Sequence, residues 1–128
     1  MDKNRVRYYN LNMKKGSFKN NPGIRIVIDK CSEIAGKYFD SFKIILYGSR
    51  ARGDFLAESD WDIIVLSSNQ PDKKTLDEFY NDVYFEVELD MNSVITAFVY
   101  SYEYWNKPLF RATPFHKSVE KEGIIYEY

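Results

Sequence analysis

Two short apolar runs, joined by a turn rich in glycine, serine and arginine, restrict what this chain can fold into. The runs lie at residues 43–47 and 63–66, and the segment between them holds a Gly-Ser pair at 48–49 and a Ser-Asp-Trp-Asp sequence at 59–62. Near-continuous apolar runs of this length are typical of strands that are covered on both faces. The sequence therefore predicts two buried strands of one sheet, with a short helical turn between them.

Asp60 and Asp62 stand where the second of these strands begins. Residues two apart in a strand point to the same face, so the two carboxylates should lie side by side. Such a pair repels itself unless a cation lies between its members. The preceding turn offers backbone N–H groups and the hydroxyl of Ser49, which are groups that hold phosphate. Magnesium ligands that face a phosphate-binding turn indicate nucleotide chemistry.

This segment resembles the signature of the nucleotidyltransferase (DNA polymerase beta-like) superfamily, and specifically its minimal nucleotidyltransferase domains. That signature is a Gly-Ser turn, usually followed by Arg-x-Arg-Gly, and then Ser-Asp-x-Asp leading into an apolar strand. The chain has Gly-Ser-Arg-Ala-Arg-Gly at residues 48–53 and Ser-Asp-Trp-Asp at residues 59–62. The rest of the chain agrees with the family only in the order of its expected elements.

The resemblance implies a role for each residue of the motif. Asp60 and Asp62 would hold Mg²⁺ and act in catalysis, with a nucleoside triphosphate as the substrate. Planar guanidinium groups beside a phosphate site also fit the binding of a triphosphate. The nucleotide-binding residues implied in this way are Gly48, Ser49, Arg50 and Arg52.

A third carboxylate, which usually completes the metal site of this superfamily, is missing from its expected place. It should lie on the strand predicted at residues 94–100, and that segment contains no acidic residue. Glu88 and Asp90 precede the strand and Glu103 follows it, and each would need a shifted register to reach the site. The departure leaves open whether the chain catalyses transfer by itself.

Simpler interpretations of the same residues remain open. The two aspartates could cap a strand and pair with Arg50 or Arg52, and these arginines could form surface ion pairs that contribute little to stability. Cys31 lies on the apolar stripe of a predicted helix and is expected to be a core thiol. His116, in a segment that looks exposed, is expected to be structural or idle.

The composition fits one soluble domain without a membrane segment. The net charge is −1, and no run approaches the roughly 20 apolar residues of a membrane helix. Residues 1–20 are basic and are predicted to form a leader, followed by a single domain at residues 21–128. One cysteine excludes an intramolecular disulfide, which suits the cytoplasm.

The remaining patterns predict a small α/β fold. Apolar residues recur at helical spacing over residues 24–39 and 75–90. These two helices should pack on a mixed sheet of about four or five strands, a size that is common for such sheets. Residues 108–114 are expected to be a loop, residues 115–122 a short helix, and residues 124–128 an edge strand or a docked tail.

The sequence therefore supports two hypotheses of function. The first is metal-dependent transfer of a nucleoside monophosphate to a hydroxyl of a protein or a small molecule. The resemblance adds a helical partner of the HEPN class, as in toxin–antitoxin-like pairs. The alternative is a nucleotide-binding or partner-binding module that keeps the fold but lacks the third carboxylate. Binding to nucleic acid is the weakest hypothesis, because the domain is acidic once the basic leader is removed.

Overall fold

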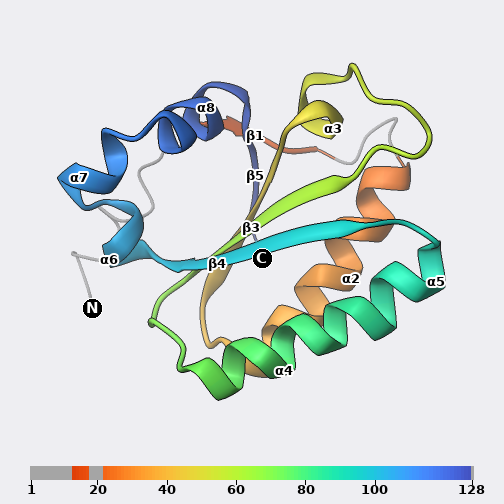
Figure 1. Ribbon diagram of the computed structural model, residues 1–128, viewed down its shortest axis with the longest axis horizontal. Coiled ribbons are helices and arrows are strands. Elements are labelled where there is room, and N and C mark those ends of the chain that lie inside the picture. The colour runs from red at the N-terminus through yellow and green to blue at the C-terminus, as the bar shows by residue number, and fades with distance from the viewer. Residues whose placement is uncertain (1–12, 18–21, 128) are drawn as a thin grey trace.

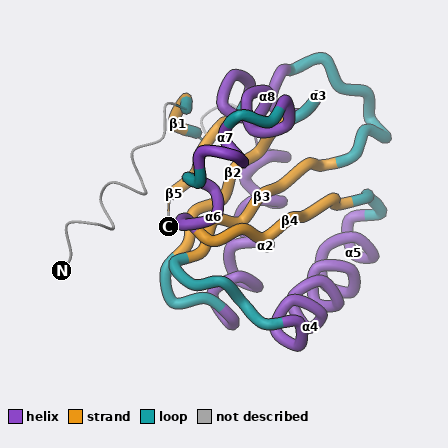
Figure 2. Tube along the Cα trace, turned by 60° about the vertical axis from the view of Figure 1, so that its left-hand side comes forward, coloured by secondary structure: helices purple, strands orange, loops and turns teal. Residues whose placement is uncertain are grey.

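The computed structural model describes residues 13–17 and 22–127, which form a mixed five-stranded sheet with helices on both faces (Figures 1 and 2). The strand order is β1-β5-β2-β3-β4. The strands are β1 (Lys14–Lys15), β2 (Phe42–Tyr47), β3 (Trp61–Ser67), β4 (Ile95–Ser101) and β5 (Ile124–Glu127). The α-helices are α2 (Pro22–Tyr38), α3 (Ser49–Arg52), α4 (Lys73–Val83), α5 (Leu89–Met91), α6 (Tyr102–Trp105), α7 (Pro108–Arg111) and α8 (Pro114–Glu122).

Strand β3 carries Asp62 and pairs with a neighbouring strand on each side. It runs antiparallel to β2 and parallel to β4, with Asp62 opposite Tyr47 on one side and Thr96 on the other. Side chains alternate across it, so Ile63 and Ile64 enter different cores. Asp62 therefore belongs to the face that also carries Ile64.

The two faces of the sheet have different covers (Figure 1). Helices α2 and α4 pack on the larger core, where Val27, Ile28 and Phe79 have no exposed surface. Helices α6–α8 cover part of the other face around Trp105, which is also fully buried. Helices α6–α8 do not extend to the N-terminal end of β3, so they leave the region around Asp62 only partly covered.

A π-helical segment, η1 (Tyr84–Glu88), joins α4 to α5 and continues the same helical rod. Asp72 caps the beginning of α4, because its carboxylate accepts a hydrogen bond of 2.8 Å from the backbone N–H of Thr75. A π-helical turn widens the helix locally, and such turns are frequent at functional sites. Val87 faces the core, whereas Tyr84 and Phe85 are 48% and 64% exposed.

The predicted fold class is confirmed, and the differences from the sequence analysis lie near the two ends of the chain. Strand β5 was expected at an edge or as a docked tail, but it lies between β1 and β2 because its Ile125 and Tyr126 are buried. The segment 108–114, expected to be a loop, contains α7. The predicted leader is not wholly separate from the domain, because β1 pairs with β5 in the sheet and Met13 is part of the smaller core. Residues 1–12 and 18–20 of that leader lie outside the described residues.

None of the helices in the described ranges combines the length and the apolar character that a membrane crossing requires.

Substitution of Phe79 tests the larger core. Its ring lies 5.6 Å from that of Phe39, measured between centroids, and has no exposed surface. Phe79→Ala should lower the free energy of unfolding by about 3–5 kcal/mol, because it leaves a cavity in the core. Chemical denaturation would measure the change. Phe85→Ala, from the same helical rod but 64% exposed, is the matched control and should stay within about 0.5 kcal/mol of the wild type. Equal losses for the two variants would contradict this description of the core.

Candidate active site

The two signature aspartates lie where β3 begins, on the face that α6–α8 only partly cover. Asp62 is half-buried between Tyr47 of β2 and Thr96 of β4, and Asp60 is exposed two residues earlier. Burial and the nearby charge of Asp60 raise the pKa of Asp62, while the positive charge of Arg52 partly opposes that rise. The charge of Asp60 therefore acts on Asp62, as the sequence spacing predicted, and Arg52 offsets only part of the rise in the pKa of Asp62.

Gly48 brings the backbone of the turn against the Asp62 carboxylate. Its φ of +74° lies in the region that favours glycine. A Cβ atom at this position would lie 2.3 Å from Oδ2 of Asp62, far inside van der Waals contact. The positive φ thus favours glycine here, and a larger residue would displace the Asp62 carboxylate, because the turn and the carboxylate share one small space.

Helix α3 follows Gly48 directly and forms the short helical turn that the sequence predicted. The carbonyl of Gly48 accepts hydrogen bonds of 3.0 Å from the N–H groups of Ala51 and Arg52, so the helix starts at Ser49. The first N–H groups of a helix have no partner within it. Those at the start of α3 thus belong to the same turn that carries Gly48 beside Asp62.

Arg50, which the motif suggested as a nucleotide-binding residue, is engaged within the protein. Its guanidinium is buried and donates hydrogen bonds to the carbonyls of Ala57 and Ser59 at 3.1 and 3.0 Å. It also stacks between the rings of Phe55 and Trp61, at 4.5 and 4.3 Å from their centroids. Arg50 therefore holds the loop that leads to Asp60, and its Nε and Nη2 donors are engaged within the protein.

Arg52 remains beside the carboxylates and at the surface. Its side chain is 44% exposed and pairs with Asp54 at 3.2 Å and with Glu122 at 3.1 Å. These ion pairs match the simpler interpretation of this residue, and exposed pairs of this kind contribute little to stability. Because its charge also acts on Asp62, Arg52 is the arginine that could turn to an incoming anion.

Thr96 is the residue that lies beside Asp62 on the strand where a third carboxylate was expected. It is the direct partner of Asp62 in the parallel pairing of β3 and β4, and it points to the same face of the sheet. Within the described residues, no three His, Cys, Asp or Glu side chains are grouped so that they could hold a metal ion. The carboxylate pair is therefore accompanied by a hydroxyl.

The three acids that could have replaced it are engaged elsewhere. Glu88 belongs to the helical rod on the opposite face of the sheet, where its Oε1 accepts a 3.1 Å hydrogen bond from the backbone N–H of Ile95. Asp90 forms an exposed ion pair of 3.1 Å with Lys30. Glu103 lies in α6, beyond the far end of β4. A shifted register, which each of them required, is not observed.

His116 and Cys31 are both buried, and neither belongs to the carboxylate site. His116 was expected in an exposed segment, but it is 1% exposed in α8, where Nε2 lies 3.0 Å from the carbonyl oxygen of Trp105. Burial is the main cause that lowers its pKa, so the ring is held neutral and structural. Burial raises the pKa of Cys31 to about 12, which makes it the expected core thiol.

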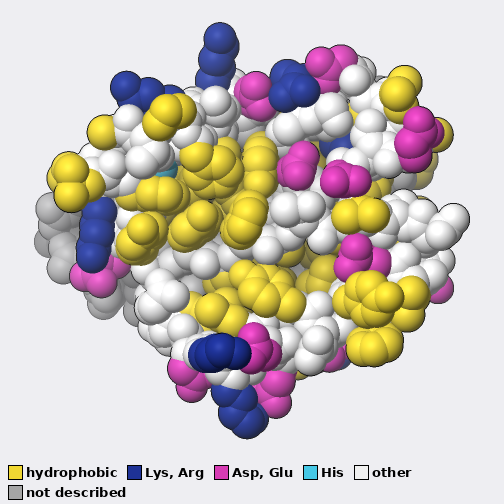
Figure 3. All heavy atoms as spheres, viewed as in Figure 1, with side chains coloured by type: hydrophobic (Ala, Val, Ile, Leu, Met, Phe, Trp, Pro, Cys, Tyr) yellow, Lys and Arg dark blue, Asp and Glu magenta, His cyan; other side chains and the backbone are white. Residues whose placement is uncertain are grey.

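An aromatic surface beside the carboxylates was not found from the sequence. Tyr47, which is the strand partner of Asp62, packs edge-on against Phe115 with 5.7 Å between ring centroids. Phe98, 40% exposed, packs against the same ring at 6.2 Å. The many tyrosine and phenylalanine residues indicated aromatic packing somewhere in the protein. They did not indicate this place, because Phe115 comes from α8 and meets these strands only in the folded chain. Figure 3 shows hydrophobic side chains gathered next to a pair of carboxylates on this side of the molecule.

Comparison with known proteins places the chain in a family. A family model described as nucleotidyltransferase domain matches residues 24–126, and the chain belongs to this family. It is also similar to a protein of Methanocaldococcus jannaschii that is provisionally named a protein adenylyltransferase. The identity is 38% over 83 residues, which cover 65% of this chain and 75% of that protein. A crystal structure of a toxin–antitoxin with AMP-PNP aligns with a TM-score of 0.49 and 18% identity, over 74% of this chain and 68% of that one.

The raised pKa of Asp62 leads to a test in the absence of any ligand. Because its folded-state pKa lies above the unfolded value of about 3.9, the ionised carboxylate destabilises the native state at neutral pH. Asp62→Asn should therefore raise the free energy of unfolding at pH 7. The gain should shrink as the pH falls through the folded-state pKa and disappear below the unfolded value.

Denaturation curves collected across this pH range would measure the effect. Asp40→Asn, at an exposed turn after α2, is the control and should give no comparable gain. A loss of stability in Asp62→Asn at pH 7 would mean that the ionised carboxylate has a stabilising partner in the native protein.

Proposed function

We propose that this protein is a metal-dependent nucleotidyltransferase, which transfers a nucleoside monophosphate from a nucleoside triphosphate to a hydroxyl group. The observation that carries this proposal is the close approach of Gly48 and the Asp62 carboxylate, with Asp60 beside them. Membership of the nucleotidyltransferase domain family supports the kind of reaction. The similarity to a named protein adenylyltransferase supports ATP as the donor and a protein side chain as the acceptor.

The residues present fit one divalent cation that is shared with the substrate. Two adjacent carboxylates whose charges disfavour each other offer oxygen ligands, which Mg²⁺ prefers. Mg²⁺ usually takes one or two carboxylates and completes its coordination with water and substrate phosphates. When bound, it would neutralise the negative charge of the triphosphate during transfer.

The chain's own groups would orient the donor. The start of α3 and the hydroxyl of Ser49 can donate hydrogen bonds to phosphate oxygens, and Gly48 leaves room for the phosphates beside Asp62. Arg52 can exchange its exposed ion pairs for the triphosphate. Arg50 would act indirectly, since it fixes the loop that presents Asp60.

The alternative is a module that binds nucleotide or a partner and has little turnover of its own. The position of Thr96, in direct register with Asp62, favours this alternative. A threonine hydroxyl is a poor base and a weak metal ligand, so the acceptor hydroxyl lacks the group that would activate it. In that case we propose that a helical partner of the HEPN class, in a toxin–antitoxin-like pair, supplies the missing acid or presents the acceptor.

Nucleotide binding is tested by thermal unfolding. A nucleoside triphosphate with Mg²⁺ should raise the melting temperature, because a ligand that binds only the native state stabilises it by about 2.7 kcal/mol at a hundredfold excess over Kd. The double variant Asp60→Asn/Asp62→Asn should lose the Mg²⁺-dependent part of the shift. Asp40→Asn should keep it. A shift that persists in the double variant would place the nucleotide elsewhere.

A gain-of-function variant separates the enzyme from the binding module. Thr96→Asp should place a third carboxylate beside Asp62 and raise the rate of transfer from labelled nucleoside triphosphate by about 10²–10⁴, the usual contribution of a positioned acid or base. Thr96→Asn has a similar size without the charge and should give no increase. If neither variant changes the rate while the wild type already transfers rapidly, the two aspartates are sufficient and the alternative is wrong.

A further inference from the structure

The outer edge of β4 is open in the part of the chain that the structure describes. Strand β4 has one neighbour in the sheet, β3, and contains seven residues without a charge or a proline. Native proteins usually protect an edge strand of this length with charged residues, proline or a bulge, since an open edge can pair with another chain. The absence of these devices from β4 therefore points to a function for the edge.

The direction of the backbone groups follows from the pairing with β3. The N–H of Trp61 donates to the carbonyl of Val94 at 2.9 Å, so the even-numbered residues of β4 bond to β3 and the odd-numbered residues face outward. The outward groups therefore belong to Ile95, Ala97 and Val99.

Two side chains from the helical rod already occupy the outward groups at the two ends. Glu88 accepts a 3.1 Å hydrogen bond from the N–H of Ile95, and the hydroxyl of Tyr80 is hydrogen-bonded by the backbone of Val99. Ala97 lies midway between them. In the described part of the chain, no side chain is recorded as hydrogen-bonded to its outward N–H or carbonyl group. Both occupying side chains are at the surface or half-buried, so they can move aside for a stronger partner.

Aromatic side chains flank the open edge on both faces of the sheet. Phe98 and Tyr104, on the α6–α8 side, are 40% and 41% exposed. Tyr80 and Tyr84, on the α4 side, are 37% and 48% exposed. Figure 3 shows hydrophobic side chains above and below the middle of this face. An added strand projects its side chains alternately to the two faces, and both would meet an aromatic wall.

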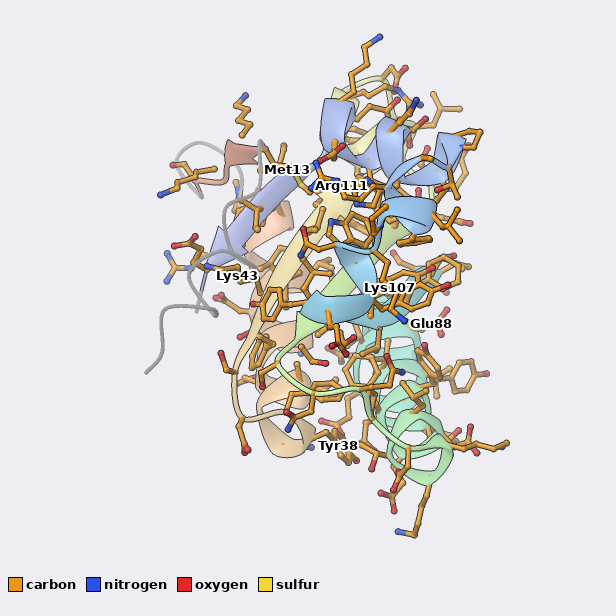
Figure 4. All side chains as sticks on the ribbon, turned by 90° about the vertical axis from the view of Figure 1, so that its left-hand side faces the viewer. Met13, Tyr38, Lys43, Glu88, Lys107 and Arg111 are labelled. Carbon is orange, nitrogen blue, oxygen red and sulfur yellow. The ribbon has the colours of Figure 1, made fainter. Side chains whose placement is uncertain are left out.

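Acidic side chains lie at the beginning of the edge. A cavity of about 340 Å³ lies beside the beginning of β4, and its lining includes Glu58, Glu88 and Val94. The other end has charges of both signs: Glu103 of α6 and Lys107 are both exposed, and the Lys107 ammonium lies 5.7 Å from the ring centroid of Tyr104. Figure 4 shows Glu88 and Lys107 on the same side of the molecule, away from Met13. A ligand along β4 is therefore favoured if it is basic at the end that lies beside Glu58 and Glu88.

We propose that the edge of β4 binds an extended segment of another polypeptide, which pairs with Ala97 and continues the sheet. The segment has alternating apolar side chains and a basic residue beside Glu58 and Glu88. Because Thr96 lies in the same strand as Ala97 and next to Asp62, a hydroxyl residue in this segment is delivered to the carboxylates. That last step rests on the proposed function, whereas the pairing itself does not.

Binding of peptides to the intact protein tests the proposal without any need for catalysis. A phage-displayed library of random octapeptides is selected on the wild type, and enriched peptides are synthesised and measured by fluorescence anisotropy. Ala97→Pro removes the outward N–H without removing a bond to β3, as proline at an edge position allows. Ala97→Ser retains the N–H and is the control. Phe98→Lys is a second variant, which puts a protective charge on the edge at an exposed position.

Enriched peptides should alternate apolar residues and bind the wild type and Ala97→Ser equally. Their affinity should fall about tenfold for Ala97→Pro and Phe98→Lys, the loss expected for one backbone hydrogen bond or for a charge against an apolar wall. The Mg²⁺–nucleotide thermal shift of Ala97→Pro should equal that of the wild type, so a failure of nucleotide binding is seen separately. The proposal is overturned if no peptide is enriched, or if both variants bind the peptides as tightly as the wild type. Sedimentation that shows a dimer, lost in both variants, would assign the edge to a second copy and overturn it as well.

Discussion

The partial burial of the Asp62 carboxylate beside a second carboxylate, that of Asp60, is the constraint on which the account of this site depends. Asp62 lies in β3 and Asp60 directly before it, and among the described residues Arg52 offsets only part of the rise in the pKa of Asp62. The native protein tolerates this arrangement because most of its stability comes from two apolar cores that hold the sheet in place from either face. A cation is the partner that this arrangement lacks, and the turn at Gly48 brings phosphate-binding groups to the same place.

The local motif was predictable from the sequence because its geometry is determined by short-range rules. The two-residue period of a strand puts Asp60 and Asp62 on one face, and the Gly-Ser pair must make the sharp turn into α3. The register between strands is a tertiary property, so the sequence could say only that the strand at 94–100 has no acid. The structure adds that Thr96 is the residue in register with Asp62. Arg50 could not be assigned from its spacing, because its carbonyl partners and its two aromatic neighbours come from the folded loop.

The errors near the chain ends have a common physical cause. The burial of His116 and the position of β5 inside the sheet both depend on contacts with residues distant in the sequence. The ring of His116 packs on Trp105 at 4.2 Å between centroids, and Ile125 pairs with Ile45 of β2. Neither contact has a periodic signal in the sequence. The open edge of β4 is a similar case, since it depends on the strand order of the whole sheet.

The central claim, that Asp60 and Asp62 hold a cation together with the triphosphate, is tested most directly by locating the metal. Crystals grown with Mn²⁺ and a non-hydrolysable nucleoside triphosphate would give an anomalous signal from the metal alone. The account predicts a peak within about 2.2 Å of carboxylate oxygens of both aspartates, as expected for an oxygen-ligated divalent cation of this size. The phosphates should lie against Gly48 and Ser49. A peak elsewhere, or a triphosphate bound away from this turn, would contradict the account.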